Sequence, residues 1–205
     1  MSKKRIVVGA IVVLLVGLLA GLFWFDSQFE EPEAKLVSSI AEETGAKSVL
    51  AIFAHPDDEQ LVTGLLIRAR ETDGAVTRMI TATKGEAGTP LPQISRVEEL
   101  GIIRHAELLK NGYALGVKEQ LVWDYPDGGL ADADFEEYVA RLEKQMLIWK
   151  PDLIVTFWPE SGFSDHSDHK TAGRAATEAV RRLRAIDPTT APKSIAYILA
   201  ARSMM

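Results

Sequence analysis

The chain has 205 residues, of which 29 are acidic and 23 are basic, giving a net charge of −6 and a pI near 5.3. This length suits one α/β domain with an appendage, and the acidic balance argues against nucleic acid, whose binding needs a basic face. Because the sequence contains no cysteine, disulfides, thiolate metal sites and a cysteine nucleophile are excluded.

An apolar segment near the N-terminus is long enough to cross a membrane. Residues 6–25 carry no charge and match the ~20 residues that a transmembrane helix needs. Basic residues precede the segment and acids follow it, so the positive-inside rule keeps the N-terminus in the cytoplasm and puts the rest outside. A cleaved signal peptide is the alternative, but no small-x-small cleavage site precedes Asp26. We therefore predict residues 1–25 as a cytoplasmic basic tip and a single-pass, uncleaved anchor.

The rest of the chain alternates apolar strands with helical segments. Residues 26–47 are predicted to be a polar spacer with a short helix over 33–44, closed by Gly45. Strands are predicted over residues 49–53, 76–83, 120–123, 152–157 and 194–199. Helices are predicted over residues 58–71, 94–109, 132–149 and 168–185. This alternation is typical of βαβ units, so residues 48–205 are predicted to form an α/β domain whose mostly parallel sheet has helices on both faces.

Two stretches rich in histidine and acids each follow an apolar strand. "AHPDDE" at residues 54–59 follows the first strand, and "WPESGFSDHSDHK" at residues 158–170 follows the fourth. Ligands of open α/β sheets bind beyond the carboxyl ends of the strands, so we expect the two stretches to meet in space. Alone, each stretch fits a helix start where acids are favoured; together they favour a functional site.

The residue types in these stretches suit a metal centre. His55 and Asp58 are three residues apart across a strand-to-helix corner, and His166 and His169 have the same spacing at a helix start. Two imidazoles and one carboxylate are a ligand set typical of catalytic zinc, and a cation would relieve the repulsion among adjacent acids. Asp57 is the candidate general base. One downstream histidine completes the metal set, and the other can stabilise an oxyanion or protonate a departing amine, as amide hydrolysis requires.

Five motifs resemble those of the LmbE-like/PIG-L family of zinc-dependent N-acetylglucosaminyl de-N-acetylases. They are "AHPDDE", "TATKGEAG" (81–88), "RHAELLKNGYALGV" (104–117), "WDYPDGGL" (123–130) and "HSDH" (166–169). The resemblance runs from about residue 48 to residue 184 and implies a Rossmann-like sheet. There are departures: Ser167 replaces a usual proline, and Val62 and Leu65 stand where glycines are common. The chain also ends at Met205, sooner than family members usually do, so we expect the C-terminal part to be short or incomplete.

The resemblance implies a metal centre and a general base. By position, His55, Asp58 and His169 match the family's zinc ligands, and Asp57 matches its base. A site with two histidines and one aspartate also accepts iron, cobalt or manganese, so the sequence leaves the physiological metal open.

The resemblance also implies roles for four further residues. His166 matches the histidine that stabilises the transition state or acts as an acid, and Asp168 matches an acid that orients the histidines. Arg104 and Asp127 match positions that contact substrate hydroxyls or a headgroup. For these two, a structural salt bridge and a turn are the alternatives.

The sequence therefore predicts a membrane-anchored, extracytoplasmic hydrolase. It would remove the N-acetyl group from an N-acetylglucosamine-type amino-sugar conjugate through a zinc-activated water. Two alternatives stay open: a zinc amidase acting on another N-acyl conjugate, and an inactive, membrane-tethered carbohydrate-binding module. Asp57 and His166, which sugar binding alone does not need, count against the inactive module. The aglycone, the acyl group and the oligomeric state are left open.

Overall fold

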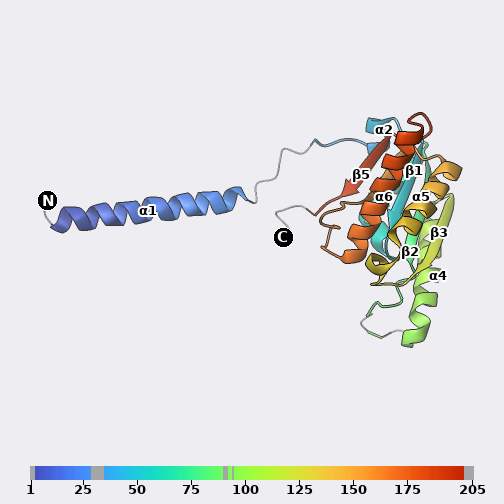
Figure 1. The fold of residues 1–205 in the computed structure, drawn as a ribbon, viewed down its shortest axis with the longest axis horizontal. Coiled ribbons are helices and arrows are strands. Elements are labelled where there is room, and N and C mark those ends of the chain that lie inside the picture. Colours follow the sequence, from blue (N-terminus) through green and yellow to red (C-terminus); the bar gives the residue numbers. More distant parts are fainter. Residues whose placement is uncertain (1–2, 29–34, 90–91, 94, 201–205) are drawn as a thin grey trace. The chain divides into compact units, whose positions relative to one another are not determined.

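The structure is a computed structural model that describes residues 3–28, 35–89, 92–93 and 95–200. Figure 1 shows its helices and strands. The helices are α1 (Lys3–Ser27), α2 (Ile40–Thr44), α3 (Thr63–Glu71), α4 (Leu100–Leu115), α5 (Phe135–Trp149) and α6 (Ser167–Ile186). The strands are β1 (Ser48–Phe53), β2 (Val76–Thr83), β3 (Glu119–Tyr125), β4 (Leu153–Phe157) and β5 (Ser194–Ile198). Short 3₁₀ turns are η1 (Asp58–Val62), η2 (Val97–Glu99) and η3 (Leu130–Asp132). Val37–Leu199 form one compact unit, and α1 belongs to another.

Helix α1 is apolar along most of its length. The 21 residues Val7–Ser27 are long and apolar enough to cross a membrane. Large apolar side chains lie exposed all along it, among them Val13, Leu19 and Phe23. A helix that is apolar around its whole circumference belongs in a core or a bilayer, so α1 fits a membrane anchor or a signal sequence by length and composition.

The strands form one five-stranded sheet in the order β3-β2-β1-β4-β5, and each neighbouring pair is parallel. This confirms the predicted α/β fold. The chain builds outward from β1 through β2 to β3 and then crosses to the other side of β1 to form β4. The strand order thus reverses between β1 and β4, which is where open α/β sheets bind their ligands.

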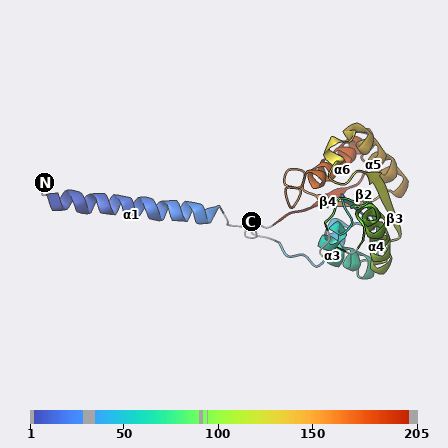
Figure 2. The ribbon, with the colours of Figure 1, turned by 90° about the horizontal axis from the view of Figure 1, so that it is seen from below.

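The central strand β1 is buried on both faces. Leu50 and Ile52 pack toward the core that includes α5 and α6, whereas Val49 and Phe53 pack toward the core that includes α2, α3 and α4. Figure 2 shows α3 and α4 on one side of the strands and α5 and α6 on the other. Burying each such large side chain contributes about 1.5–3 kcal/mol. A sheet covered on both faces explains why β1 reads as a continuous apolar run.

Three helices begin later than predicted: α2, predicted over 33–44; α4, predicted over 94–109; and α5, predicted over 132–149. Two of these starts are set by caps. The Ser39 hydroxyl accepts the N–H of Ala41 at the start of α2, and the Asp134 carboxylate accepts two N–H groups at the start of α5. Residues 33, 34 and 94 of the predicted helices lie outside the described residues.

The helix predicted over residues 58–71 is instead two elements, η1 and α3. The break arises because the Asp58 carboxylate bonds back to the end of β1 rather than pointing away from it. Strand β3 is longer than the predicted 120–123, whereas β1, β2, β4, β5 and α6 match their predicted ranges to within one residue at each end.

Candidate active site

The stretch after β1 makes a tight corner that separates two adjacent acids. One oxygen of Asp58, Oδ2, accepts the backbone N–H groups of Ala54 (3.1 Å) and His55 (2.8 Å), which holds this carboxylate against the strand end. Asp57 has φ +95°, a left-handed conformation that costs a residue with a side chain about 1–3 kcal/mol. As a result Asp58 is 6% exposed, whereas the Asp57 side chain is 60% exposed.

The stretch after β4 carries the two downstream histidines to the start of α6. His166 is the N-cap, and its Nδ1 accepts the N–H of Asp168 (3.2 Å). The His169 ring stacks on Phe157 with 4.1 Å between centroids and 4° between planes. Nδ1 of His169 lies 2.9 Å from the Gly162 carbonyl oxygen. Because a carbonyl only accepts, Nδ1 carries the hydrogen, and Nε2 presents a lone pair.

Gly162 makes room for this arrangement. It has φ +56°, and a Cβ there would lie 2.9 Å from the Cβ of His169. Gly173 lies on α6 one turn after His169 and is tighter still, since a Cβ there would lie 2.3 Å from the Phe157 carbonyl oxygen. The two glycines let the loop and α6 approach the end of β4 closely, and that approach fixes where His169 lies.

The two stretches meet, as the topology predicts. Nδ1 of His55 lies 3.1 Å from Nε2 of His169, across 114 residues of sequence. Oδ1 of Asp58 lies 3.3 Å from the same Nε2, and Oδ2 of Asp58 lies 3.8 Å from Nδ1 of His55. His166 joins them, since ligand atoms of the three histidines lie within 4.8 Å of one another.

This donor set fits a cation. The lone pair of His169 Nε2 faces a carboxylate oxygen of Asp58, and two acceptors at 3.3 Å repel unless a proton or a metal ion lies between them. His55, Asp58 and His169 are all less than 10% exposed, and buried charge requires such compensation. The described residues therefore include a His/Asp group able to hold a metal ion.

The other nitrogen of His55 faces two more acids. Nε2 lies 3.1 Å from Oδ2 of Asp168 and 3.1 Å from Oδ1 of Asp127. Asp168 is fully buried and also accepts the N–H groups of Gly128 (2.8 Å) and Leu130 (3.1 Å). His55, Asp127 and Asp168 thus form a second group with metal-ligand spacing. Asp127, predicted to contact substrate, lies directly against the histidine.

The hydrogen bond between His55 and Asp168 contributes to a shift in the pKa of both groups. Burial alone would lower the pKa of His55, but the hydrogen bond to Asp168 and the charges of Asp58, Asp127 and Asp168 outweigh it and raise the pKa above 6.5. Burial alone would raise the pKa of Asp168, but the His55 and Gly128 hydrogen bonds outweigh it and lower the pKa. Asp168 is therefore the buried carboxylate partner of His55 Nε2.

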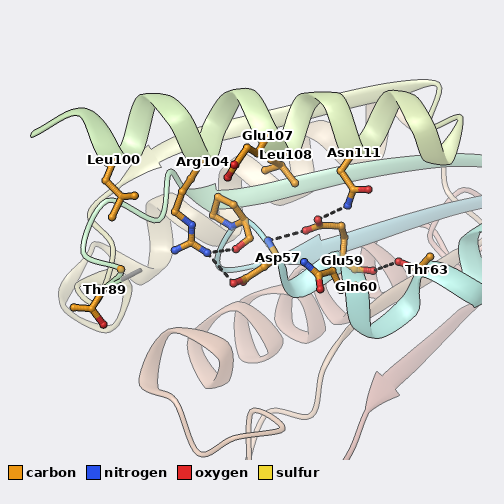
Figure 3. Close-up of a pocket in the computed structure, with 12 residues that line it drawn as sticks. Asp57, Glu59, Gln60, Thr63, Thr89, Leu100, Arg104, Glu107, Leu108 and Asn111 are labelled. Carbon is orange, nitrogen blue, oxygen red and sulfur yellow. Dashed lines mark hydrogen bonds and ion pairs between the residues drawn. The ribbon is translucent and has the colours of Figure 1, made fainter. Parts of the chain in front are cut away.

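Asp57 and Arg104 line a cavity of about 670 Å³ between η1 and α4 (Figure 3). This volume is within the ~300–1,000 Å³ of small-molecule sites. Arg104 Nη2 donates to Oδ2 of Asp57 (2.8 Å) and to the Pro56 carbonyl (2.6 Å), and Nη1 donates to the Gly85 carbonyl (3.1 Å). Desolvation by the neighbouring protein raises the pKa of Asp57 even though much of its side chain is exposed, and the Arg104 charge opposes that rise. His55, His166 and His169 are not among the residues that line this cavity, whereas Asp57 is.

Sequence reasoning missed two residues next to Asp57. Glu59 and Asn111 hydrogen-bond to each other across 52 residues and both line the cavity. The available signal was their place in the first and third motifs, since Glu59 ends "AHPDDE" and Asn111 follows Arg104 by seven residues.

Comparison with known proteins gives matches along most of the folded domain. A family model described as GlcNAc-PI de-N-acetylase (PIG-L) matches residues 50–180. The 1D-myo-inositol 2-acetamido-2-deoxy-alpha-D-glucopyranoside deacetylase 1 of Catenulispora acidiphila is 34% identical over 175 residues, which cover 75% of this chain and 53% of that protein. The probable N-acetyl-alpha-D-glucosaminyl L-malate deacetylase 2 of Bacillus cereus is 31% identical over 139 residues, which cover 67% and 62% of the two chains.

A solved structure agrees with these sequence matches. The N,N'-diacetylchitobiose deacetylase of Pyrococcus horikoshii superposes with a TM-score of 0.60 at 28% identity, covering 74% of this chain and 56% of that one. The chain spans about half the length of the first of these relatives. Because the family model matches more than half of the residues and follows the strands and helices that carry both histidine stretches, the chain belongs to the GlcNAc-PI de-N-acetylase (PIG-L) family.

Proposed function

We propose that this protein is a metal-dependent hydrolase that removes the N-acetyl group from an N-acetylglucosamine-type conjugate. The observation that best supports the proposal is the approach of His55, Asp58 and His169 to within 3.1–3.8 Å of one another, beside Asp57. The three relatives named above share an N-acetylated amino sugar in their names and differ in what is attached to it. The attached group is therefore the part of the substrate that the proposal leaves free.

Zinc is the metal we propose, held by His55, Asp58 and His169. Two imidazole nitrogens and a carboxylate oxygen match the ligand types of catalytic zinc sites, which keep one position open. When bound there, the ion would polarise the acetyl carbonyl and make water more acidic.

Asp57 is proposed as the general base. Its Oδ2 is occupied by Arg104, while no hydrogen bond among the described residues reaches Oδ1. Oδ1 can therefore accept a proton from the attacking water, a contribution typically worth about 10²–10⁴ in rate. The same proton can then pass to the amine nitrogen as the C–N bond breaks, which gives acetate and the free amino sugar.

His166 is proposed to stabilise the oxyanion. Its Nδ1 accepts the Asp168 N–H, so the neutral ring carries its hydrogen on Nε2. Its ring centre lies 4.9 Å from that of His55 and 5.0 Å from that of His169. An exposed N–H donor beside the metal group suits a carbonyl oxygen that gains negative charge.

Arg104 and Asp127 remain our candidates for substrate contact. Arg104 has five N–H donors, and hydrogen bonds to Asp57, Pro56 and Gly85 use three of them among the described residues, so the other two are candidates to bind a ligand. Asp127 uses Oδ2 to accept the Ala87 N–H (2.9 Å) and keeps Oδ1 near His55.

For the N-terminal segment we propose an uncleaved anchor that leaves the enzyme domain outside the cytoplasm. The support is the length and composition of α1 and the basic residues before it. N-terminal sequencing of the mature membrane protein tests this. Recovery of the original N-terminus supports an anchor, whereas a start near Ser27 would identify a signal sequence.

The test of function is acetate release by the full chain from three compounds: the N-acetylglucosamine–inositol conjugate, N-acetylglucosaminyl malate and N,N'-diacetylchitobiose. We expect release from at least one, its loss with a chelator, and its return with Zn²⁺. Release only from other N-acyl compounds would favour the amidase alternative. Sugar binding without any acetate release would favour the inactive module.

A further inference from the structure

The strained backbone of Asp57 is held from one helix. With φ +95°, Asp57 adopts a conformation that residues with side chains avoid, and such conformations persist only where the surroundings enforce them. Its carbonyl accepts the Gln60 N–H within the η1 turn (3.0 Å), and two side-chain contacts hold the rest of the residue. One reaches its backbone N–H, the other its carboxylate, and both lead to α4.

The backbone contact passes through Glu59. Its Oε2 accepts the N–H of Asp57 (3.0 Å), and its Oε1 accepts the side-chain N–H of Asn111 on α4 (2.5 Å). Figure 3 shows the three residues in line, from Asn111 through Glu59 to Asp57. Glu59 is only 2% exposed, and a buried carboxylate is tolerated when its oxygens are hydrogen-bonded.

The carboxylate contact comes from Arg104. It lies seven residues before Asn111, two helical turns away on the same face of α4. Its Nη2 holds Oδ2 of Asp57 and the Pro56 carbonyl at once. Helix α4 therefore contacts both the carboxylate and the backbone N–H of Asp57. Arg104 holds the carboxylate directly, and Asn111 acts on the N–H through Glu59.

We infer that Glu59 and Asn111 are positioning residues, which hold the Asp57 backbone in its left-handed conformation and thereby fix where its carboxylate lies. The inference rests on the proposed role of Asp57 as general base. Neither residue contacts a ligand atom of the metal group among the hydrogen bonds of the described residues. Their effect should therefore be on kcat, because misplacing a reacting group by about 1 Å can cost about 10²-fold.

The test is a swap of hydrogen-bonding roles between the two side chains. Asn111→Asp places a second carboxylate against Glu59 and should lower kcat by about 10²-fold, with KM and zinc content unchanged. Glu59→Gln, added to Asn111→Asp, restores a donor toward position 111 and keeps an acceptor for the Asp57 N–H. The double variant should recover to within about threefold of the wild type. Lys110→Ala, exposed and adjacent on α4, is the matched control and should not change kcat.

A second readout does not depend on activity. Hydrogen exchange of the Asp57 amide should be slow in the wild type and in the double variant, and fast in Asn111→Asp and Asn111→Ala. If the wild type released no acetate from any of the three compounds, the proposed function would fail, and the exchange pattern would still decide whether the pair holds Asp57.

Three results would overturn the inference. They are an unchanged kcat in both Asn111 variants, a fall in kcat that is explained by loss of bound zinc, and a double variant whose kcat is no higher than that of Asn111→Asp alone. Thermal unfolding identifies a variant that fails to fold. Asn111→Ala, which introduces no new charge and should lower kcat about tenfold, then replaces Asn111→Asp in the comparison.

Discussion

The two ends of the parallel sheet use acidic side chains in opposite ways. At the amino end, Asp152 accepts the N–H groups of Lys47 (3.0 Å) and Ser48 (3.1 Å) and pairs with Lys193 (2.9 Å), so one carboxylate joins the starts of β1, β4 and β5. At the carboxyl end, three carboxylates surround His55.

The difference lies in the balance of donors and acceptors. Around Asp152 each carboxylate oxygen has a donor, and the group is complete within the protein. Around His55 and His169, lone pairs and carboxylate oxygens outnumber the hydrogens that could lie between them. A balanced cluster stabilises the fold, whereas an excess of acceptors is what a site for a cation requires.

Loss of a metal ligand should give the largest effect. His169→Ala removes Nε2 from the centre of the acceptor cluster, so we expect loss of bound zinc and of measurable acetate release. Asp58→Asn should behave similarly, with activity only partly restored by excess zinc. Metal analysis beside kcat checks both, and normal zinc content in His169→Ala would remove this residue from the ligand set.

The neighbouring acid should separate chemistry from metal binding. Asp57→Asn keeps the shape but cannot take up a proton, so kcat should fall about 10²–10⁴-fold, with zinc content unchanged and no rescue by added zinc. Zinc stoichiometry and kcat are measured on the same preparation. Equal metal loss in Asp57→Asn and Asp58→Asn would make Asp57 a ligand as well.

His166→Ala should give the next largest effect. Removal of one oxyanion donor typically costs about 10²–10³ in kcat, and zinc should stay bound because His55, Asp58 and His169 remain. The same paired measurement applies. A variant that loses zinc while His169→Ala keeps it would exchange the roles of the two histidines.

At the amino end the effect should be on stability alone. Asp152→Ala leaves two N–H groups and a lysine without their partner, and we expect the free energy of unfolding to fall by about 1–3 kcal/mol with kcat unchanged. Asp124→Ala is the control, because this side chain is 76% exposed and its ion pair contributes little. Urea unfolding measures both. A loss of kcat in Asp152→Ala would mean that the two ends are not independent.

Lowering the pH should give the smallest and most gradual effect, a loss of the stability that Asp152 contributes. Burial would raise the pKa of Asp152, but Lys193 and the two backbone N–H groups outweigh it and lower the pKa below 3.8. A lowered carboxyl pKa gives stability that is present above 3.8 and is lost as the pH falls through the folded value. The difference in unfolding free energy between wild type and Asp152→Asn should therefore shrink below pH 3.8. A constant difference from pH 6 to pH 3 would contradict this.

Patterns along the chain predicted the strands well because burial on both faces leaves a plain signal. The apolar run of β1 and the alternation of elements were enough to predict a parallel sheet and the meeting of the two histidine stretches. The break between η1 and α3 was not predicted, because it depends on the Asp58 side chain bonding to a strand end.

Two further contacts between distant side chains were not predicted either. Asn111 hydrogen-bonds to Glu59 across 52 residues. Asp127 lies against His55, and the loop that carries Asp127 is held by the hydrogen bond from the Gly128 N–H to Asp168. Spacing along a sequence reports which residues share a face of one element. It does not report which faces of different elements touch.

The reversal of strand order between β1 and β4 also bears on how the site forms during folding. His55 follows β1 and His169 follows β4, and the two strands become neighbours only after about a hundred residues of chain have closed into a loop. A fragment that lacks either strand cannot hold the complete His55–Asp58–His169 group. An ion bound by both histidines would link the carboxyl ends of β1 and β4. At a concentration 100 times its dissociation constant it would stabilise the native state by about 2.7 kcal/mol. Separation of β1 from β4 would therefore cost this additional free energy while the ion stays bound.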